Sequence, residues 1–516
     1  MLDPDFLEKL NVEKLLSTAK NGDYESKKFA IKALGMLKEE RSVDILREIA
    51  WNSEYTLIRG NAIWALGEIG STEDASDLKH LALYDVDESI RISSIKALGY
   101  IGDKSVIRDL INLVVHDPSK NVRLAAAWAC SELDPDMSLK EIIPWLKKPD
   151  AEVRGYAAEA MGMIQTDTSL KYLIRALKDE KVVVRRAAAR SLGQIGSEEA
   201  VPALVECLND VDDRVRRAAV KSMGEIGSDQ AVPDLIESLR KSGDRIFKGM
   251  VVWSLGIIGD DRAANILNEL LIHDEYIIRK SAIWALGEIC CTDHIEGLIE
   301  GLYDKRDDMR KEAAEALGKL GDRRAVFELL RALNYHDPGV RKDAAYALGV
   351  LGEDIAVKYL KALLSDPSPQ VRKETVIALG KIGNESPVTD LIRLLYYDDR
   401  QLRQCAAWAL GCIGDEMAVA DLVTILKDEG PHVRGEAVKA LGKIGDPDAL
   451  ENLIDVLSDD NRWVRKYAVR ALAEIGGEKS MMSLIRAFNQ QPPWLMDDIL
   501  ESLFILEKKH YSGKRV

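Results

Sequence analysis

The sequence predicts an all-α protein, an α-solenoid of about sixteen helical hairpins that each span 31 or 32 residues. One phrase returns along the chain at that interval, for example IRGNAIWALGEIG from residue 58 and LRQCAAWALGCIG from residue 402. Within the phrase, apolar residues recur with the period of an amphipathic helix. No segment alternates polar and apolar residues over a useful length, so no sheet is expected.

Each repeat begins with a helix built around an anchoring arginine. Apolar residues lie one before it and three, six, seven and ten after it, and the third and sixth are mostly alanine, which lets a neighbouring helix approach closely. Glycines follow, as Gly67 and Gly70 do after Arg59, and the second suits a helix C-cap. The anchors are Arg59, Arg91, Arg123, Arg154, Arg185, Arg216, Arg279, Arg310, Arg341, Arg372, Arg403, Arg434 and Arg465, with Lys27, Lys248 and Met496 in three further repeats.

A second apolar helix follows the glycines. A capping side chain such as Ser71 or Asp103 precedes it, and a DP, DD or DE turn ends the repeat. A hairpin with two apolar stripes cannot bury both alone, so the hairpins must stack on one another. The predicted organisation is a capping helix over 1–22, repeats 1–7 over 23–240, repeats 8–15 over 241–490, and a C-terminal capping helix with a basic tail over 491–516.

Two repeats depart from the pattern. The fourth ends ACSELDPDMSLKEIIPWL, without the usual glycines, and the eighth has Lys248 in place of the arginine. Lost anchor contacts permit a change in curvature. We therefore predict a bend near residues 240–250 within one continuous solenoid.

Composition and charge exclude several classes of protein. The chain has no apolar run of the length that a membrane span needs, and its acidic start does not resemble a signal peptide. Six irregularly spaced cysteines indicate reduced thiols, so a cytoplasmic protein is expected. The net charge of -15 argues against wholesale wrapping by nucleic acid or attraction to an anionic membrane, but a local basic patch is compatible with it.

The phrase VRxxAAxALGxIGD, followed by AVxxLIxxL, resembles the HEAT-like repeats of phycobilisome bilin lyases and deoxyhypusine hydroxylases over essentially the whole chain. The resemblance implies that the arginine helices line a concave, ligand-binding side. Deoxyhypusine hydroxylases hold two irons with His-Glu pairs directly after the arginine. In those positions this chain has Lys311-Glu312, Lys373-Glu374 and Gly435-Glu436. We therefore expect no metal, no cofactor and no catalytic residue, and any activity would be a lyase-like chromophore attachment.

The candidate binding residues are aromatic and basic side chains on the face of the arginine helices that points away from the apolar stripe. The first and fifth residues after the arginine lie farthest from that stripe. Trp or Tyr often occupies the fifth position, and interface cores are enriched in Trp, Tyr and Arg. Repeats six and seven add a basic cluster. The predicted partner-binding residues are Trp64, Trp128, Tyr156, Arg186, Arg190, Arg214, Arg217, Lys221, Trp253, Trp284, Tyr346, Trp408, Trp463 and Tyr467, with Tyr100 and Trp494 at related positions.

Each of these features has a structural alternative. An indole could fill the groove to the neighbouring repeat, and the basic cluster could be a solvated surface balanced by Asp210, Asp212, Asp213 and Glu225. The anchors themselves are expected to pair with turn acids such as Asp210 or Asp337. The side chains of His116, His273 and His336 are expected to cap or pack. Cys405 and Cys412 flank Trp408, but two sulfurs do not complete a tetrahedral metal site.

Together these residues predict a scaffold or adaptor that binds a partner protein through the arginine-helix face. One alternative is a bilin-lyase-like protein that handles a tetrapyrrole in the aromatic groove. Another is nucleic-acid binding, in which the basic cluster contacts phosphates. No membrane partner is expected, and the oligomeric state is not predicted.

Overall fold

The computed structural model describes residues 12–490, 495, 498–499, 501–503 and 505–506. Every regular element in these residues is a helix, which confirms the predicted all-α solenoid. The helices group into two compact units, Met1–Ile266 and Leu267–Val516. The predicted domain limits and the predicted bend near residues 240–250 stay predictions. Trp494, Met496 and most of the predicted C-terminal segment 491–516 lie outside the described residues.

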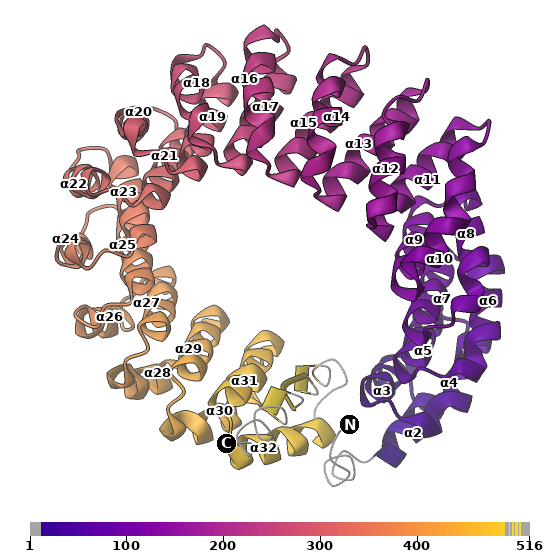
Figure 1. The fold of residues 1–516 in the computed structure, drawn as a ribbon. Coiled ribbons are helices and arrows are strands. Elements are labelled where there is room, and N and C mark those ends of the chain that lie inside the picture. The colour runs from indigo at the N-terminus through magenta and orange to yellow at the C-terminus, as the bar shows by residue number, and fades with distance from the viewer. Residues whose placement is uncertain (1–11, 491–494, 496–497, 500, 504, 507–516) are drawn as a thin grey trace, which may run out of the picture. The chain divides into compact units, whose positions relative to one another are not determined.

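In the first unit, the first helix of each repeat, called here the arginine helix, has fourteen residues. In each unit these helices lie side by side in one layer, with the second helices on its outer side (Figure 1). The arginine helices of this unit are α3 (Tyr24–Leu37), α5 (Thr56–Ile69), α7 (Glu88–Ile101), α9 (Lys120–Leu133), α11 (Ala151–Ile164), α13 (Val182–Ile195), α15 (Asp213–Ile226) and α17 (Arg245–Ile258). The second layer contains α2 (Val12–Asn21), α4 (Val43–Asn52), α6 (Ala75–Tyr84), α8 (Ile107–His116), α10 (Pro135–Ile142), α12 (Asp167–Ala176), α14 (Val201–Glu206) and α16 (Val232–Lys241).

The second unit repeats the same two layers. Its arginine helices are α19 (Tyr276–Ile289), α21 (Asp307–Leu320), α23 (Pro338–Leu351), α25 (Pro369–Ile382), α27 (Arg400–Ile413), α29 (Pro431–Ile444) and α31 (Arg462–Ile475). Its second helices are α20 (Ile295–Gly301), α22 (Arg323–Ala332), α24 (Val357–Leu363), α26 (Val388–Leu394), α28 (Val419–Ile425), α30 (Leu450–Val456) and α32 (Gly477–Gln490), while α18 (Ala264–Glu269) spans the limit between the units.

Short 3-10 turns lead into or extend many of the second helices. They are η1 (Glu40–Ser42), η2 (Thr72–Asp74), η3 (Lys104–Val106), η4 (Ile143–Lys147), η5 (Glu198–Ala200), η6 (Cys207–Asn209), η7 (Asp229–Ala231), η8 (Asp261–Ala263), η9 (Leu270–Ile272), η10 (Thr292–His294), η11 (Asp354–Ala356), η12 (Glu416–Ala418) and η13 (Pro447–Ala449). A bilayer-crossing helix needs about 20 residues. None of the helices in the described residues meets the length and hydropathy that such a crossing requires.

Most arginine helices end as the glycine pattern predicts. Gly70, for example, has φ of 82° and serves as the left-handed C-cap of α5. Three repeats place a non-glycine residue with positive φ there, Lys38, Gln165 or Cys290, while α9 ends at Asp134 in an extended conformation. A left-handed conformation costs such a residue about 1–2 kcal/mol. These three helix ends are therefore strained relative to the glycine ends.

The earlier glycine, present in most repeats, has a different role, which is close packing between neighbouring arginine helices. A Cβ atom added to Gly67 would lie 2.7 Å from the Cα atom of Ala97, and one added to Gly380 would lie 2.7 Å from the Cα atom of Ala409. Both distances are shorter than a carbon–carbon contact allows. Glycine on one helix and alanine on the next thus set the spacing of the stack.

The anchoring arginines join the turns of consecutive repeats. Arg185 donates from Nη1 to the carbonyl oxygens of Asp179 and Glu180 in the preceding turn, at 2.9 and 3.1 Å. Its Nε and Nη2 atoms donate to the carboxylate of Asp210 in the next turn, at 2.7 and 2.9 Å. We call the aspartate that lies 25 or 26 residues after its arginine the forward aspartate. The same pairing joins Arg59–Asp85, Arg91–Asp117, Arg154–Asp179, Arg341–Asp366, Arg403–Asp428 and Arg434–Asp459.

We call this series of arginine–aspartate pairs the arginine ladder. It confirms the prediction that Asp210 pairs with an anchoring arginine, but the same prediction for Asp337 is wrong. Asp337 accepts a hydrogen bond from the backbone N–H of Gly339 at 2.6 Å and caps α23. The residues 25 and 26 positions after Arg310 are Tyr335 and His336, so the forward position has no acid. Arg310 instead binds Asp307 and, at 3.2 Å, Asp343. The error is a shift of two residues within the turn.

The ladder predicts that stability falls in acid. The hydrogen bond from Arg185 lowers the pKa of Asp210 below its ordinary value. A carboxyl whose pKa is lower in the folded than in the unfolded protein stabilises the fold above the unfolded value of about 3.9, and this stabilisation is lost as the pH falls through the folded value. We expect the free energy of unfolding to be constant near neutral pH and to drop below about pH 4. Urea denaturation between pH 7 and pH 3 measures this. The Asp210→Asn variant should show a smaller drop, and an equal drop would contradict this assignment.

Candidate functional site

The aromatic residues predicted at the fifth position after the anchor all lie on arginine helices and are half-buried. They are Trp64 on α5, Trp128 on α9, Trp253 on α17, Trp284 on α19, Tyr346 on α23 and Trp408 on α27. We call them the aromatic row. The side chains of the aromatic row are neither fully buried between the helices nor fully exposed to solvent. Each of its members therefore combines a packing contact with a surface that a partner could reach.

For Trp64, Trp128 and Trp408, the packing contact is with the glycine of the preceding repeat. A Cβ atom built on Gly35 would lie 2.9 Å from Cζ3 of Trp64, and one built on Gly380 would lie 2.9 Å from Cζ3 of Trp408. Trp128 approaches Gly99 in the same way, with a corresponding distance of 3.1 Å. One edge of each indole therefore fills the space that the absent glycine side chain leaves. The groove-filling alternative explains this edge, while partner binding by the exposed part stays a prediction.

Cations accompany the tyrosine of the aromatic row. Lys381 Nζ lies 4.3 Å from the ring centre of Tyr346, and the Tyr346 hydroxyl donates to Glu315 at 3.0 Å. Burial, together with this hydrogen bond, raises the pKa of Tyr346 to about 12. The ring is therefore neutral at physiological pH and presents one face to a lysine.

The other predicted aromatic residues differ in exposure. Trp463 is half exposed at 50%, with Arg462 4.7 Å from its ring centre. Tyr467 is half-buried over Gly435, with Lys439 4.7 Å from its ring centre. Tyr156 is covered on one side by the anchor Arg123, whose guanidinium carbon lies 3.9 Å from the ring centre. Tyr156 thus stacks on the ladder, while Trp463 offers the largest free aromatic surface of these three.

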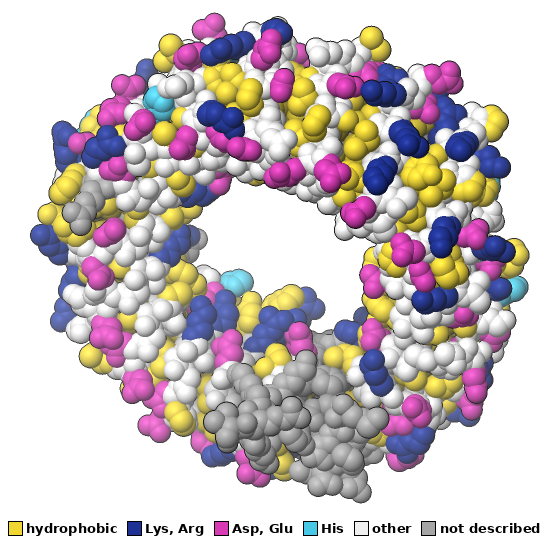
Figure 2. Space-filling view, in the orientation of Figure 1, with side chains coloured by type: hydrophobic (Ala, Val, Ile, Leu, Met, Phe, Trp, Pro, Cys, Tyr) yellow, Lys and Arg dark blue, Asp and Glu magenta, His cyan; other side chains and the backbone are white. Residues whose placement is uncertain are grey.

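The predicted basic cluster is largely paired with acids of its own chain. Arg214 binds Asp212 at 2.8 Å, and Lys221 binds Glu225 at 2.8 Å. Arg217 binds both Asp213 at 3.0 Å and Asp244 at 2.9 Å. Arg186 on α13 is half-buried and Arg190 is exposed, and within the described residues neither forms an ion pair. Lys and Arg side chains also lie interspersed with Asp and Glu across the face seen in Figure 2.

The structure adds a set of half-buried and buried carboxyls that the sequence reasoning did not select. They stand two residues after four anchors of the second unit, at Glu312, Asp343, Glu374 and Glu436, while Arg403 has Cys405 in that position. Burial raises the pKa of the first three. Lysines accompany two of them, since Lys342 lies 3.3 Å from Asp343 and Lys439 lies 2.7 Å from Glu436. The recurrence of an acid two positions after the anchor was the available sequence signal.

The remaining titratable candidates are structural. His273 accepts a hydrogen bond from the backbone N–H of Glu275 at 3.0 Å, and His116 packs against Trp145 with ring centres 5.2 Å apart, as expected for capping and packing. Burial raises the pKa of Cys405 to about 11, which leaves it as a neutral thiol. Within the described residues, no group of three or more His, Cys, Asp or Glu side chains is placed to hold a metal ion.

A family model of HEAT repeats matches residues 12–94, 81–141, 139–222, 208–287, 295–368, 358–432 and 419–503. These matches cover most of the chain, and the chain belongs to the HEAT-repeat family. No curated protein matches the sequence.

Solved structures agree on the architecture. Yeast importin-β (Kap95p) is 14% identical, with 98% of this chain and 84% of that chain covered and a TM-score of 0.52. The Kap95–Nup1 complex gives the same identity and coverage with a TM-score of 0.53. The complex of CpcE and CpcF of phycocyanin lyase from Nostoc sp. PCC7120 is 25% identical over 46% of this chain and 94% of that chain, with a TM-score of only 0.31. At such low identity the importin likeness shows the fold alone.

Proposed function

We propose that this protein is a scaffold that binds a partner protein along its arginine helices. The observation that carries the proposal is the aromatic row, in which the same position of six arginine helices, three in each unit, holds a half-buried Trp or Tyr. A half-buried indole is held in place by its packed edge, so little conformational entropy is lost when a partner covers the rest. Aromatic side chains of this kind are frequent hot spots of protein interfaces.

The charges beside the row favour a protein partner of mixed polarity. Lys381 and Lys439 lie over tyrosine rings, and Glu315 accepts a hydrogen bond from Tyr346. Because most members of the basic cluster are neutralised within the chain, only Arg186 and Arg190 remain to contact an acidic group of the partner. A long polyanion needs many such contacts in register. A folded or extended protein segment needs only a few, together with apolar contact.

Replacing Trp253, Trp284 and Trp408 together by alanine should weaken partner binding without unfolding the solenoid. A hot-spot tryptophan contributes about 2 kcal/mol or more, so we expect at least about a 30-fold loss of affinity. The partner is first isolated by affinity purification from the native cell, and its affinity is then measured by calorimetry with purified components.

Trp51→Ala is the matched control. Trp51 is 38% exposed on the second helix α4 and contacts His80, with ring centres 5.5 Å apart. Its removal also deletes a partly exposed indole, but from the other layer, and binding should not change. Circular dichroism confirms that both variants remain helical. Unchanged affinity of the triple variant would remove the proposal.

A further inference from the structure

Arg216 is an anchoring arginine that lacks a forward aspartate. Its Nη1 atom donates to the carbonyl oxygens of Asp210 and Val211, at 2.7 and 3.3 Å, as the other anchors do with their preceding turns. The forward position, 26 residues on, is occupied by Ser242. Within the described residues, the Nε and Nη2 atoms of Arg216 have no hydrogen-bond partner. This guanidinium edge is the one with which seven other anchors bind their forward aspartate.

Ser242 accepts the hydrogen bond within the turn that the aspartate accepts in other repeats, but it supplies no carboxylate for the arginine. Its hydroxyl accepts a hydrogen bond from the backbone N–H of Asp244 at 3.1 Å. Asp210 accepts the same bond from Asp212 at 2.9 Å in its own turn. The turn geometry is therefore preserved, but serine is shorter than aspartate and carries no charge.

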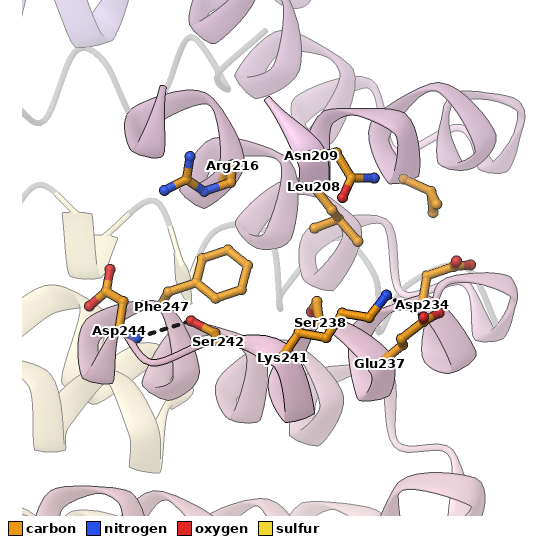
Figure 3. A pocket seen from close by; sticks show the side chains of 11 residues that line it. Leu208, Asn209, Arg216, Asp234, Glu237, Ser238, Lys241, Ser242, Asp244 and Phe247 are labelled. Atoms are coloured by element: carbon orange, nitrogen blue, oxygen red, sulfur yellow. Dashed lines mark hydrogen bonds and ion pairs between the residues drawn. The ribbon is translucent and has the colours of Figure 1, made fainter. Parts of the chain in front are cut away.

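A pocket of about 250 Å³ opens at this position. Arg216, Ser242 and Phe247 line one part of it, and Leu208, Asn209, Ser238 and Lys241 are among the residues that line the rest (Figure 3). The pocket can hold a carboxylate together with a short apolar stem, since a single water molecule occupies about 30 Å³ of liquid volume. All of these residues belong to the first unit.

Three acids also line the pocket, and two of them are already bound. Asp244 accepts hydrogen bonds from Arg217 and from the backbone N–H of Ile246, both at 2.9 Å. Glu237 is paired with Lys241. Asp234 lies with Glu237 on the opposite side of the pocket from Arg216 (Figure 3). At the Arg216 end, the only acid is therefore engaged with another arginine.

A second pocket in the same unit also lies beside an anchor that has serine in its forward position. It has a volume of about 460 Å³ and lies beside Lys27, the anchor of the first repeat. The forward position of Lys27 is also a serine, Ser53, whose hydroxyl accepts a hydrogen bond from the backbone N–H of Tyr55 at 3.3 Å. Two pockets thus open where a cationic anchor faces serine instead of aspartate.

We propose that the pocket beneath Arg216 binds a carboxylate in the place that the forward aspartate occupies in other repeats. The ligand is either an acidic side chain of a protein segment or a small free carboxylate, and two N–H groups of Arg216 would hold its oxygens as Arg185 holds Asp210. The site is lined by the first turns of α15 and α17, by α16 and by the connecting turns, and it contains no residue of the aromatic row, so it stands independently of the proposed function.

The test uses the full-length protein and measures hydrogen exchange of the backbone amides in residues 208–217 and 242–250. The probes are succinate and a capped peptide with one aspartate beside a leucine, each at constant ionic strength. We expect saturating carboxylate to slow exchange in these segments about fivefold, the effect of one partly exposed ion pair. Slowing by succinate and peptide alike indicates a free carboxylate as ligand, and slowing by the peptide alone indicates a protein segment.

Two substitutions of Ser242 make the test specific. In Ser242→Asp the chain supplies its own carboxylate, so exchange should be slow without a probe and should not respond to one. Asparagine has the size of aspartate but no charge, so without a probe the Ser242→Asn variant should exchange as the wild type does. The proposal is overturned if neither probe slows exchange in the wild type, or if the probes act equally on Ser242→Asp.

Discussion

The Arg185→Ala variant is expected to lose about 3 kcal/mol of stability, the cost of breaking a mostly buried ion pair by removal of one partner. The side chains of Arg185 and Asp210 are only 12% and 10% exposed. The substitution leaves the Asp210 carboxylate without its guanidinium, and it frees the carbonyl oxygens of Asp179 and Glu180. One side chain thus connects three turn residues across two repeats.

Urea denaturation followed by circular dichroism measures this loss, and hydrogen exchange locates it. Because each repeat contacts only its neighbours, exchange should accelerate in α13 and α15 before it does so elsewhere. Arg262→Ala is the matched control, since Arg262 also binds an aspartate, Asp260 at 2.7 Å, but is 51% exposed. Its loss should cost less than about 1 kcal/mol. Equal effects of the two variants would show that the ladder is not a main source of stability.

Replacing Gly380 by alanine should destabilise the second unit by about 1–3 kcal/mol through overpacking. The new Cβ atom would lie 2.7 Å from Cα of Ala409 and 2.9 Å from Cζ3 of Trp408. Since the nearest atom is backbone, α25 and α27 must move apart, and Trp408 must shift with them. The gain in helix propensity of about 1 kcal/mol offsets only part of this cost.

Gly249→Ala is the control for Gly380→Ala. Gly249 also lies within an arginine helix, α17, but a Cβ atom added there meets nothing within 4 Å. This variant should gain about 0.5–1 kcal/mol from helix propensity. Thermal denaturation of both variants, with Trp fluorescence as a local probe, gives the comparison. Equal stability of Gly380→Ala and Gly249→Ala would contradict the close packing of α25 against α27.

Most of the fold could be predicted from the sequence because residues within each repeat determine its helices and turns. The spacing of apolar residues around Arg59 predicts the helix, Gly70 predicts its end, and the recurrence of the phrase predicts the stack. The aspartate that pairs with each anchoring arginine could not be predicted in the same way, as Asp337 shows. An acid near the turn was correctly expected to matter, but only coordinates reveal that the arginine reaches 25 or 26 residues forward and not 27.

The candidate site was less predictable for the same reason. Helical angle placed Trp408 away from the apolar stripe, yet its exposure depends on Gly380 in the preceding repeat, which a single helix does not reveal. The burial of Glu374 likewise depends on helices on both sides. Ser242 is unremarkable as a turn residue, and its importance follows only once the ladder defines the position that it fails to fill.

Hydrogen exchange of the purified protein, alone and with the partner recovered by affinity purification, tests the central claim most directly. Partner binding along the aromatic row predicts protection in the arginine helices, above all α17, α19 and α27, which hold Trp253, Trp284 and Trp408. Protection confined to the second helices, such as α4, α6 or α26, would contradict the account. In that case the aromatic row would serve only to pack one repeat on the next.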